Sequence, residues 1–363
     1  MEKKKKILYI CGSLNQTSMM HQISCHLSDF ESCFTPYYAD GFVRQLAHAG
    51  YLEFTILGKK LKEKAEIYLH EHSLSIDPHG TANDYDLVMT CSDLIVPKNI
   101  RDKRLILVQE GMTDPKTIMY YLVKWMKLPR YMASTATTGM SNAFDYFCVA
   151  SEGYREHFLK NKVGPEKIIV TGIPNFDNCK NYLNNDFPYR NFVLAATSDA
   201  RETYRFENRK KFIRKAVEIA AGRQLIFKLH PNENFARATK EINKWAPEAL
   251  VLTSGNPHEM IANCDALITK FSTLVYTGIA LGKEVYSDFD TDTLRGLAPI
   301  QNGGTSALNI ANVARRLLEM EITRKTPKKQ LFRKIRSRLL DSKVRAESQQ
   351  GSKRKEKTRR KIL

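Results

Sequence analysis

The feature that constrains this chain most is the alternation of short apolar runs with amphipathic stretches. The apolar runs are nearly continuous, which is typical of strands buried on both faces of a parallel sheet. The alternation predicts a doubly wound α/β architecture. The predicted strands are Ile7–Cys11, Asp86–Thr90, Arg104–Val108, Tyr146–Ala150, Lys167–Thr171, Phe192–Ala196, Gln224–Leu229, Ala249–Leu252 and Ala266–Ile268, and the predicted helices are Ser18–Asp29, Lys60–His72, Pro115–Lys127, Gly153–Asn161, Glu207–Ala221 and Asn234–Trp245.

A length of 363 residues favours two domains over one core. Turn-forming residues cluster in Ile173–Arg190, so we place the joint there and expect domains at residues 1–178 and 179–323. A ligand between two such sheets meets the carboxyl ends of their strands.

The positive charge is concentrated in a tail. Residues 324–363 hold 17 Lys or Arg and three acids, against a net charge of +18 for the whole chain, so the body is close to neutral. Within Lys328–Leu340, apolar and basic residues alternate at helical spacing, which predicts a basic amphipathic helix on anionic lipid, and Gly351–Lys361 is predicted to be disordered. Nucleic-acid binding is disfavoured because no aromatic residue follows Phe332. A solubilising role stays open.

Several classes of protein are disfavoured. The seven cysteines are scattered without a Cys-x-x-Cys pair, which argues against a disulfide framework and a thiolate zinc site. No apolar run approaches the roughly 18–20 residues of a membrane-spanning helix. Asp84-Tyr85-Asp86 matches a metal-binding Asp-x-Asp pattern, but Leu87–Met89 continues as a buried strand, so we expect no metal site. These patterns predict a cytoplasmic protein.

Polar motifs follow the predicted strands where they end. The loop after the first strand can hold an anionic or hydroxylated ligand, or can cap the following helix. It lacks the glycine patterns of dinucleotide and P-loop sites. Its candidate ligand-binding residues are Gly12, Ser13, Asn15, Gln16 and Thr17.

Gln109-Glu110-Gly111 follows the strand Arg104–Val108, and the Glu110 carboxylate is a candidate general base, or a cap for the helix that begins at Asp114-Pro115. His230-Pro231 follows Lys228 at another strand end, where a histidine can donate to a phosphate or protonate a leaving group. We take Lys228 and Pro231 as candidate donor-binding residues beside it.

Two further segments are candidates for binding a donor phosphate. Ser272 and Thr273 follow the strand Ala266–Ile268 and offer two hydroxyls before a helix, as an anion cradle or a simple cap. Gly303, Gly304 and Thr305 form a glycine-rich turn before another helix, to contact the donor or only to cap that helix.

The order of these motifs resembles that in metal-independent glycosyltransferases with two Rossmann-like domains, the GT-B type, and in particular bacterial sialyltransferases, polysialyltransferases and Kdo transferases. The matching residues are Glu110, His230-Pro231 and Ser272-Thr273, while Gln109 replaces the first of two acids. The resemblance implies that Glu110 is the general base and that His230, Ser272 and Thr273 hold the nucleotide phosphate.

By this resemblance, residues 1–178 bind the acceptor and residues 179–323 bind the nucleotide-sugar. The implied reaction is transfer from a CMP-, CDP- or UDP-activated sugar, without metal or cofactor, to a surface glycan or lipid-linked acceptor in bacterial cell-envelope polysaccharide biosynthesis, at the inner face of the cytoplasmic membrane. The alternatives are a CDP-glycerol-type polyol-phosphate transferase and a UDP-N-acetylglucosamine 2-epimerase-like enzyme, in which turns similar to Ala280–Val285 occur. A non-catalytic glycan- or nucleotide-binding scaffold is the alternative from another class.

Overall fold

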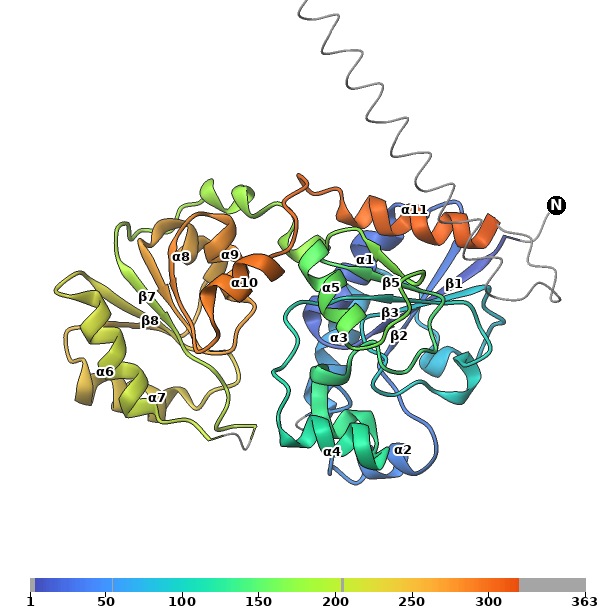
Figure 1. Cartoon of the computed structure of the whole chain (residues 1–363), viewed down its shortest axis with the longest axis horizontal. Coiled ribbons are helices and arrows are strands. Elements are labelled where there is room, and N and C mark those ends of the chain that lie inside the picture. Colours follow the sequence, from blue (N-terminus) through green and yellow to red (C-terminus); the bar gives the residue numbers. More distant parts are fainter. Residues whose placement is uncertain (1–3, 54, 204–205, 320–363) are drawn as a thin grey trace, which may run out of the picture.

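The computed structural model describes residues 4–53, 55–203 and 206–319, which form two lobes, each built on a parallel sheet (Figure 1). The first sheet has the strand order β2-β1-β3-β4-β5-β6 and the second has the order β11-β10-β7-β8-β9. The first sheet comprises β1 (Lys6–Cys11), β2 (Glu31–Pro36), β3 (Leu87–Thr90), β4 (Leu105–Val108), β5 (Tyr146–Val149) and β6 (Ile168–Val170), and the second comprises β7 (Val193–Ala196), β8 (Leu225–Lys228), β9 (Leu250–Leu252), β10 (Ala266–Ile268) and β11 (Glu284–Tyr286).

The predicted α/β fold class, with two parallel sheets, is confirmed. Every predicted strand has a counterpart, whereas β2 and β11 were not predicted because β2 mixes polar with apolar residues and β11 has three residues at a sheet edge. The helices are α1 (Leu14–Cys25), α2 (Gly41–His48), α3 (Lys59–Glu71), α4 (Ile118–Met126), α5 (Glu152–Lys160), α6 (Arg209–Ala220), α7 (Phe235–Trp245), α8 (Pro257–Asn263), α9 (Leu274–Ala280), α10 (Thr291–Leu297) and α11 (Ser306–Glu319).

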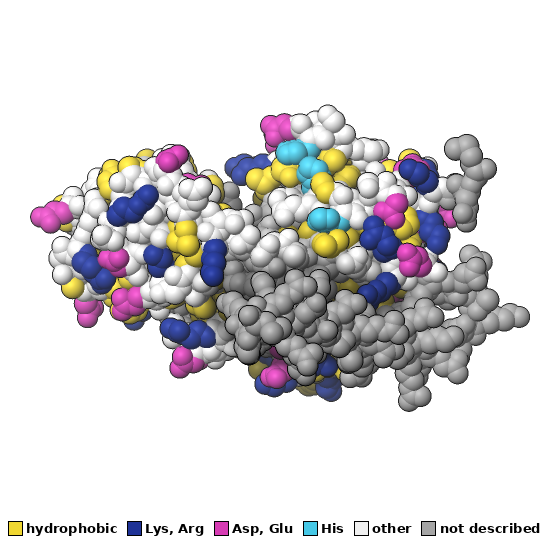
Figure 2. All heavy atoms as spheres, turned by 90° about the horizontal axis from the view of Figure 1, so that it is seen from above, with side chains coloured by type: hydrophobic (Ala, Val, Ile, Leu, Met, Phe, Trp, Pro, Cys, Tyr) yellow, Lys and Arg dark blue, Asp and Glu magenta, His cyan; other side chains and the backbone are white. Residues whose placement is uncertain are grey.

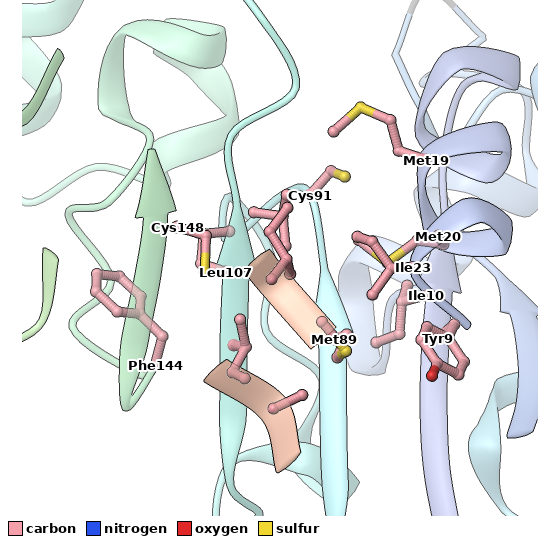
Figure 3. Close-up of a cluster of buried hydrophobic side chains, with 14 of the residues drawn as sticks. Tyr9, Ile10, Met19, Met20, Ile23, Met89, Cys91, Leu107, Phe144 and Cys148 are labelled. Atoms are coloured by element: carbon pink, nitrogen blue, oxygen red, sulfur yellow. The ribbon is translucent and has the colours of Figure 1, made fainter. Parts of the chain in front are cut away.

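The core of the first domain is built on its sheet and includes side chains of α1. Tyr9 and Ile10 from β1, Met89 from β3 and Leu107 from β4 are buried, and in the close-up they lie near Met20 and the other core side chains of α1 (Figure 3). Burial of such side chains contributes about 1.5–3 kcal/mol each. The sheet is therefore a rigid support for the loops that follow its strands.

The last of the described helices, α11, returns to the first domain. Its buried residues Ile310, Ala314 and Leu317 belong to the same core cluster as β1 and β3, and α11 lies against α1 (Figure 1). The Arg315 guanidinium donates to the Asp29 carboxylate at 3.0 Å, beyond the end of α1. The expectation that residues 179–323 form one unit is therefore corrected: the chain crosses between the domains twice, and α11 completes the first.

The two crossings are hydrogen-bonded to each other. The first contains the 3₁₀ helices Pro174–Phe176 and Cys179–Leu183, and its Asp177 carboxylate accepts the backbone N–H of Ser306 at 2.8 Å. The Asp177 carbonyl accepts the N–H of Gly303 at 3.1 Å. Burial raises the pKa of Asp177. These bonds hold the segment before α11 against the predicted joint.

A buried contact joins the two lobes beside these crossings. The Tyr154 hydroxyl of α5 and the Tyr276 hydroxyl of α9 lie 2.6 Å apart, and burial raises the pKa of both phenols, so the pair is neutral. Gly153 lies so close to α10 that a β-carbon on it would be 1.9 Å from the Gly296 carbonyl oxygen. Only a glycine fits at position 153 in this arrangement.

Acid should weaken the second domain through His258. This imidazole stacks on Tyr182 with ring centroids 4.7 Å apart, its Nδ1 lies 2.9 Å from Thr277 Oγ1, and burial lowers its pKa to about 4. The unfolded chain takes up this proton near pH 6.5, so stability is lost progressively as pH falls from about 6.5 to 4, by about 3 kcal/mol. Urea denaturation across this range checks it: His258→Gln, which keeps a hydrogen-bonding group but does not titrate, should flatten the profile, and an unchanged profile would contradict the assignment.

Among the described residues, none of the helices is long and apolar enough to cross a bilayer. The predicted amphipathic helix within Lys328–Leu340 and the predicted disordered stretch Gly351–Lys361 lie outside the described residues. Six of the seven cysteines are buried and Cys25 is exposed, and all seven are free thiols.

Candidate active site

The carboxyl ends of the two sheets meet at Gly111 and Thr273. Gly111 follows β4 of the first sheet, and Thr273 follows β10 of the second. A β-carbon on Gly111 would lie 2.7 Å from Thr273 Cγ2 and 3.8 Å from the Phe176 ring. The predicted Gln109–Gly111 and Ser272–Thr273 motifs, more than 150 residues apart in sequence, are therefore neighbours across the domain boundary.

The Glu110 carboxylate is held by two side chains from the loop after β1. Ser13 Oγ donates to Oε1 at 2.7 Å, and Gln16 Nε2 donates to Oε2 at 2.5 Å. Ser13 Oγ also accepts the N–H of Gln16 at 3.2 Å, which caps α1. One serine thus caps a helix, as one of the two predicted roles of this loop requires, and also orients the Glu110 carboxylate.

Gln109 has a different role from its neighbour. Its side chain is buried, with Nε2 donating to the Gly111 carbonyl at 2.8 Å and Oε1 accepting the N–H of Ala150 at 2.9 Å. The amide therefore ties the end of β4 to the end of β5. A carboxylate lacks the donor for the first of these bonds, which gives a physical reason for glutamine here.

A cavity of about 570 Å³ opens beside Glu110, between the domains. Polar groups from Glu110, Asp114 and Thr135 line one part of it, and Thr273 and Thr203 contribute from the second domain. The lining also has a large apolar part that was not predicted from the sequence: Tyr37, Leu52, Ile56, Leu57, Leu61, Leu94, Ile95, Met112, Tyr131, Met132 and Phe176. Small-molecule sites combine an apolar lining with a few polar groups in this way.

The three other residues of the first loop that were predicted to bind substrate lie in different environments. Asn15 lines the cavity, and its carbonyl accepts from Asn175 Nδ2 at 3.3 Å. Gly12 lies so close to Gln16 that a β-carbon would meet its side-chain oxygen at 2.0 Å. Thr17 is fully buried, and its hydroxyl donates to the Ser13 carbonyl at 2.9 Å, so this hydroxyl stabilises α1 and does not face the cavity.

His230 lies at the same edge of the second sheet as Ser272, because β8 and β10 both flank β7. Its Nδ1 accepts the N–H of Asn232 at 3.3 Å, which leaves Nε2 as the ring nitrogen that can donate to a ligand. The Asp199 carboxylate lies 3.6 Å from Nδ1. His230 follows the carboxyl end of β8 but is not among the residues that line the cavity.

A buried ion network fixes the loop that carries His230. The Glu233 carboxylate accepts the N–H of His230 at 3.0 Å and the hydroxyl of Thr197, and Arg209 donates to it at 2.5 Å. Arg209 also contacts Glu207 at 3.1 Å. Buried charges of this kind are retained where they fix a geometry, and removing one partner leaves the other uncompensated.

Other predicted donor-binding residues lie outside the cavity lining. Lys228 is buried, its ammonium donates to the Leu229 carbonyl at 2.8 Å, and burial lowers its pKa. This ammonium is engaged within its own domain, and the predicted contact of Lys228 with the donor stays a prediction. Pro231 is exposed, and Ser272 Oγ accepts the N–H of Leu274 at 3.3 Å.

The glycine-rich turn lies at the inter-domain crossing. Gly303, Gly304 and Thr305 are exposed, and the Thr305 hydroxyl donates to the Asn302 carbonyl at 3.1 Å. The turn is hydrogen-bonded to Asp177 and does not line the cavity. It therefore joins the two domains, and its predicted contact with the donor stays a prediction.

The described part of the chain holds no group of three or more His, Cys, Asp or Glu placed to bind a metal ion. Asp86 of the Asp-x-Asp pattern accepts the backbone N–H of Lys6 at 2.8 Å, and Asp84 pairs with Lys103. Both carboxylates precede β3 and so lie at the amino ends of the strands, whereas Glu110 lies at their carboxyl ends.

Comparison with solved structures identifies proteins with a similar fold. No protein-family model matches the sequence, and no curated protein matches it. The structure is similar to UDP-N-acetylglucosamine 2-epimerase from Neisseria meningitidis, solved with UDP-N-acetylglucosamine, with a TM-score of 0.52 and 13% identity over 86% of this chain and 100% of that one. It is also similar to the S. aureus protein MnaA solved with UDP, with a TM-score of 0.52 and 12% identity over 89% and 99% of the two chains.

This chain has a GT-B-like fold. At 12–13% identity the likeness extends to the fold alone, so the activity is argued from this chain's own residues.

Proposed function

We propose that this chain is a metal-independent glycosyltransferase that moves a sugar from a nucleotide-activated donor to a hydroxyl group of a surface glycan or lipid-linked acceptor. The observation that carries the proposal is the Glu110 carboxylate, oriented by Ser13 and Gln16 in a cavity that the second domain closes through Thr273. A fixed carboxylate beside a substrate-sized cavity suits removal of a proton from an acceptor hydroxyl.

The donor side of the reaction is assigned to the second domain. We assign to it the His230 Nε2 and the hydroxyls of Ser272 and Thr273, which follow the carboxyl ends of β8 and β10, and Thr273 lies against Gly111. Neutral donors placed around a departing phosphate stabilise its growing charge without a metal ion. Closing of the lobes over the Glu110 cavity would exclude water, which competes with the acceptor for the activated sugar.

The second candidate is a sugar-nucleotide 2-epimerase, which the likeness to epimerase structures along nearly the whole chain favours. An epimerase needs no acceptor, so the two candidates differ in one assay. The purified chain is incubated in EDTA with CMP-, CDP- and UDP-activated sugars, with and without a mixture of cell-envelope glycans. Acceptor-dependent release of one nucleotide supports the transferase, whereas an epimer formed from the donor alone overturns it.

Gln16 should act as a positioning residue for the base. Gln16→Met keeps the length and burial of the side chain but removes its hydrogen bond to Glu110, and a hydrogen bond to a charged group contributes about 1.5–3 kcal/mol. We expect kcat to fall by roughly tenfold with little change in donor KM. Gln22→Met on the same helix is the matched control, since that exposed side chain donates only to Ser18. Equal activity of the two variants would exclude this role.

The location proposed with this function is the inner face of the cytoplasmic membrane, where a lipid-linked acceptor is displayed. We assign contact with that anionic surface to the basic segment of residues 324–363.

A further inference from the structure

Helix α4 exposes an apolar face that the proposed chemistry does not use. Its other face carries Tyr120 and Val123, which pack on the 3₁₀ helix Arg130–Thr137 in a small core separate from the main one. Figure 1 shows α4 at the lower edge of the first lobe, away from the sheet. We use the name interfacial face for the exposed apolar residues Ile118, Met119, Tyr121, Trp125, Met126 and the adjoining Met132.

The exposure of this face is large for a soluble helix. Ile118 is 79% exposed and Trp125 is 84% exposed, while Tyr121 and Met126 are each more than half exposed. A contiguous apolar area of this kind marks an interaction site. Figure 2 gives the contrast: on the α11 side of the molecule, outside the grey region, apolar side chains form small groups among Lys, Arg, Asp and Glu.

The charge around the interfacial face has one sign. Exposed Lys116, Lys124 and Lys127 flank it, and the sequence has neither Asp nor Glu between Asp114 and Asp145. The Lys116 and Lys124 ammonium groups lie 5.3 and 5.8 Å from the centre of the Tyr120 ring. Two copies meeting through this face in a symmetric dimer would bring lysines against lysines. The charge therefore favours a negatively charged partner over a second copy.

The interfacial face is continuous with the Glu110 cavity. Met132 is 45% exposed and also lines the cavity, next to Tyr131. The apolar surface of Met132 is therefore shared by the interfacial face and the cavity. A lipid surface fits all three observations, because tryptophan and tyrosine favour the boundary between headgroups and acyl chains, and lysines favour anionic headgroups.

We propose that the interfacial face of α4 docks on an anionic lipid surface, with Trp125 inserted at the headgroup boundary. This docking site is distinct from the basic segment of residues 324–363, and it does not rest on the proposed transfer reaction, because lipid binding is measured without a donor.

The tryptophan content of the chain allows a direct test. The chain has two tryptophans, so Trp245→Phe in the full-length protein leaves Trp125 as the only one. We expect its emission to shift to the blue with vesicles of phosphatidylglycerol and phosphatidylcholine, and to be quenched when the acyl chains carry bromine. Protein that co-sediments with vesicles while Trp125 stays unquenched would overturn the proposal. An emission shift that depends on protein concentration without vesicles would also overturn it, in favour of a second copy.

A matched pair of variants measures the contribution of the face. Trp125→Glu should lower the vesicle partition coefficient by about tenfold, since burying one large apolar side chain contributes roughly that factor or more. Val217→Glu is the control, because Val217 is 43% exposed on α6 among lysines and arginines and the change in charge is the same. Equal partition of the two variants would show that charge alone holds the protein to the vesicle and would contradict docking through α4.

Discussion

Replacing Glu110 with glutamine should lower kcat by about a thousandfold, while the fold and the affinity for the nucleotide stay unchanged. General-base catalysis typically contributes between roughly a hundredfold and ten-thousandfold. Glutamine has the same shape and still accepts the hydrogen bond from Ser13, but it cannot take a proton from the acceptor. Nucleotide release with acceptor present, at saturating donor, measures this loss.

Asp114→Asn is the control for the loss of Glu110. Asp114 lines the same cavity, and its carboxylate accepts the Thr135 hydroxyl at 2.8 Å. Its amide variant removes the same negative charge from the same cavity, so we expect less than about a tenfold loss of kcat. Full activity of Glu110→Gln together with an inactive Asp114→Asn would assign the base to Asp114 instead.

Gly153→Ala should separate the lobes at the α5–α10 contact. The added methyl would lie 1.9 Å from the Gly296 carbonyl oxygen and 2.8 Å from its carbonyl carbon, and both are backbone atoms that cannot rotate away. Overpacking of this kind costs about 1–3 kcal/mol or more, and here the relief requires movement of α10. We expect the urea midpoint to fall and activity to fall with it, because Gly111 and Thr273 meet across the same domain boundary.

The other glycine of this contact provides the control. A β-carbon on Gly296 would meet nothing within 4 Å, so Gly296→Ala should change stability by no more than about 1 kcal/mol. A Gly153→Ala variant as stable as Gly296→Ala would show that the lobes do not pack in this way.

Sequence reasoning placed the strand ends well and the contacts between them less well. The periodicity of apolar residues located β4, β8 and β10. Because the strands are parallel, Glu110 lies at the carboxyl ends of the first sheet's strands, and His230 and Thr273 lie at those of the second. The meeting of Gly111 with Thr273 depends on how the lobes pack, which no local pattern encodes.

The missed features have physical reasons as well. An amphipathic pattern shows that α11 buries one face but not which sheet covers it, so its return to the first domain was not predicted. A glycine-rich turn before a helix fits a ligand loop and a chain crossing equally, and Gly303 proved to be in a crossing. Ser13 and Gln16 were predicted to bind substrate, and their hydrogen bonds to Glu110, which join two distant segments, were not predicted.

The most direct test of the central claim is a thermal-shift measurement in EDTA with CMP, CDP and UDP. A ligand that binds only the folded state raises Tm by mass action. We predict that one nucleotide raises Tm, that Glu110→Gln retains this shift, and that His230→Ala loses it because the Nε2 donor is gone. Absence of a shift with all three nucleotides, or a shift that appears only when a divalent metal is restored, would contradict a metal-independent nucleotide site in the second domain.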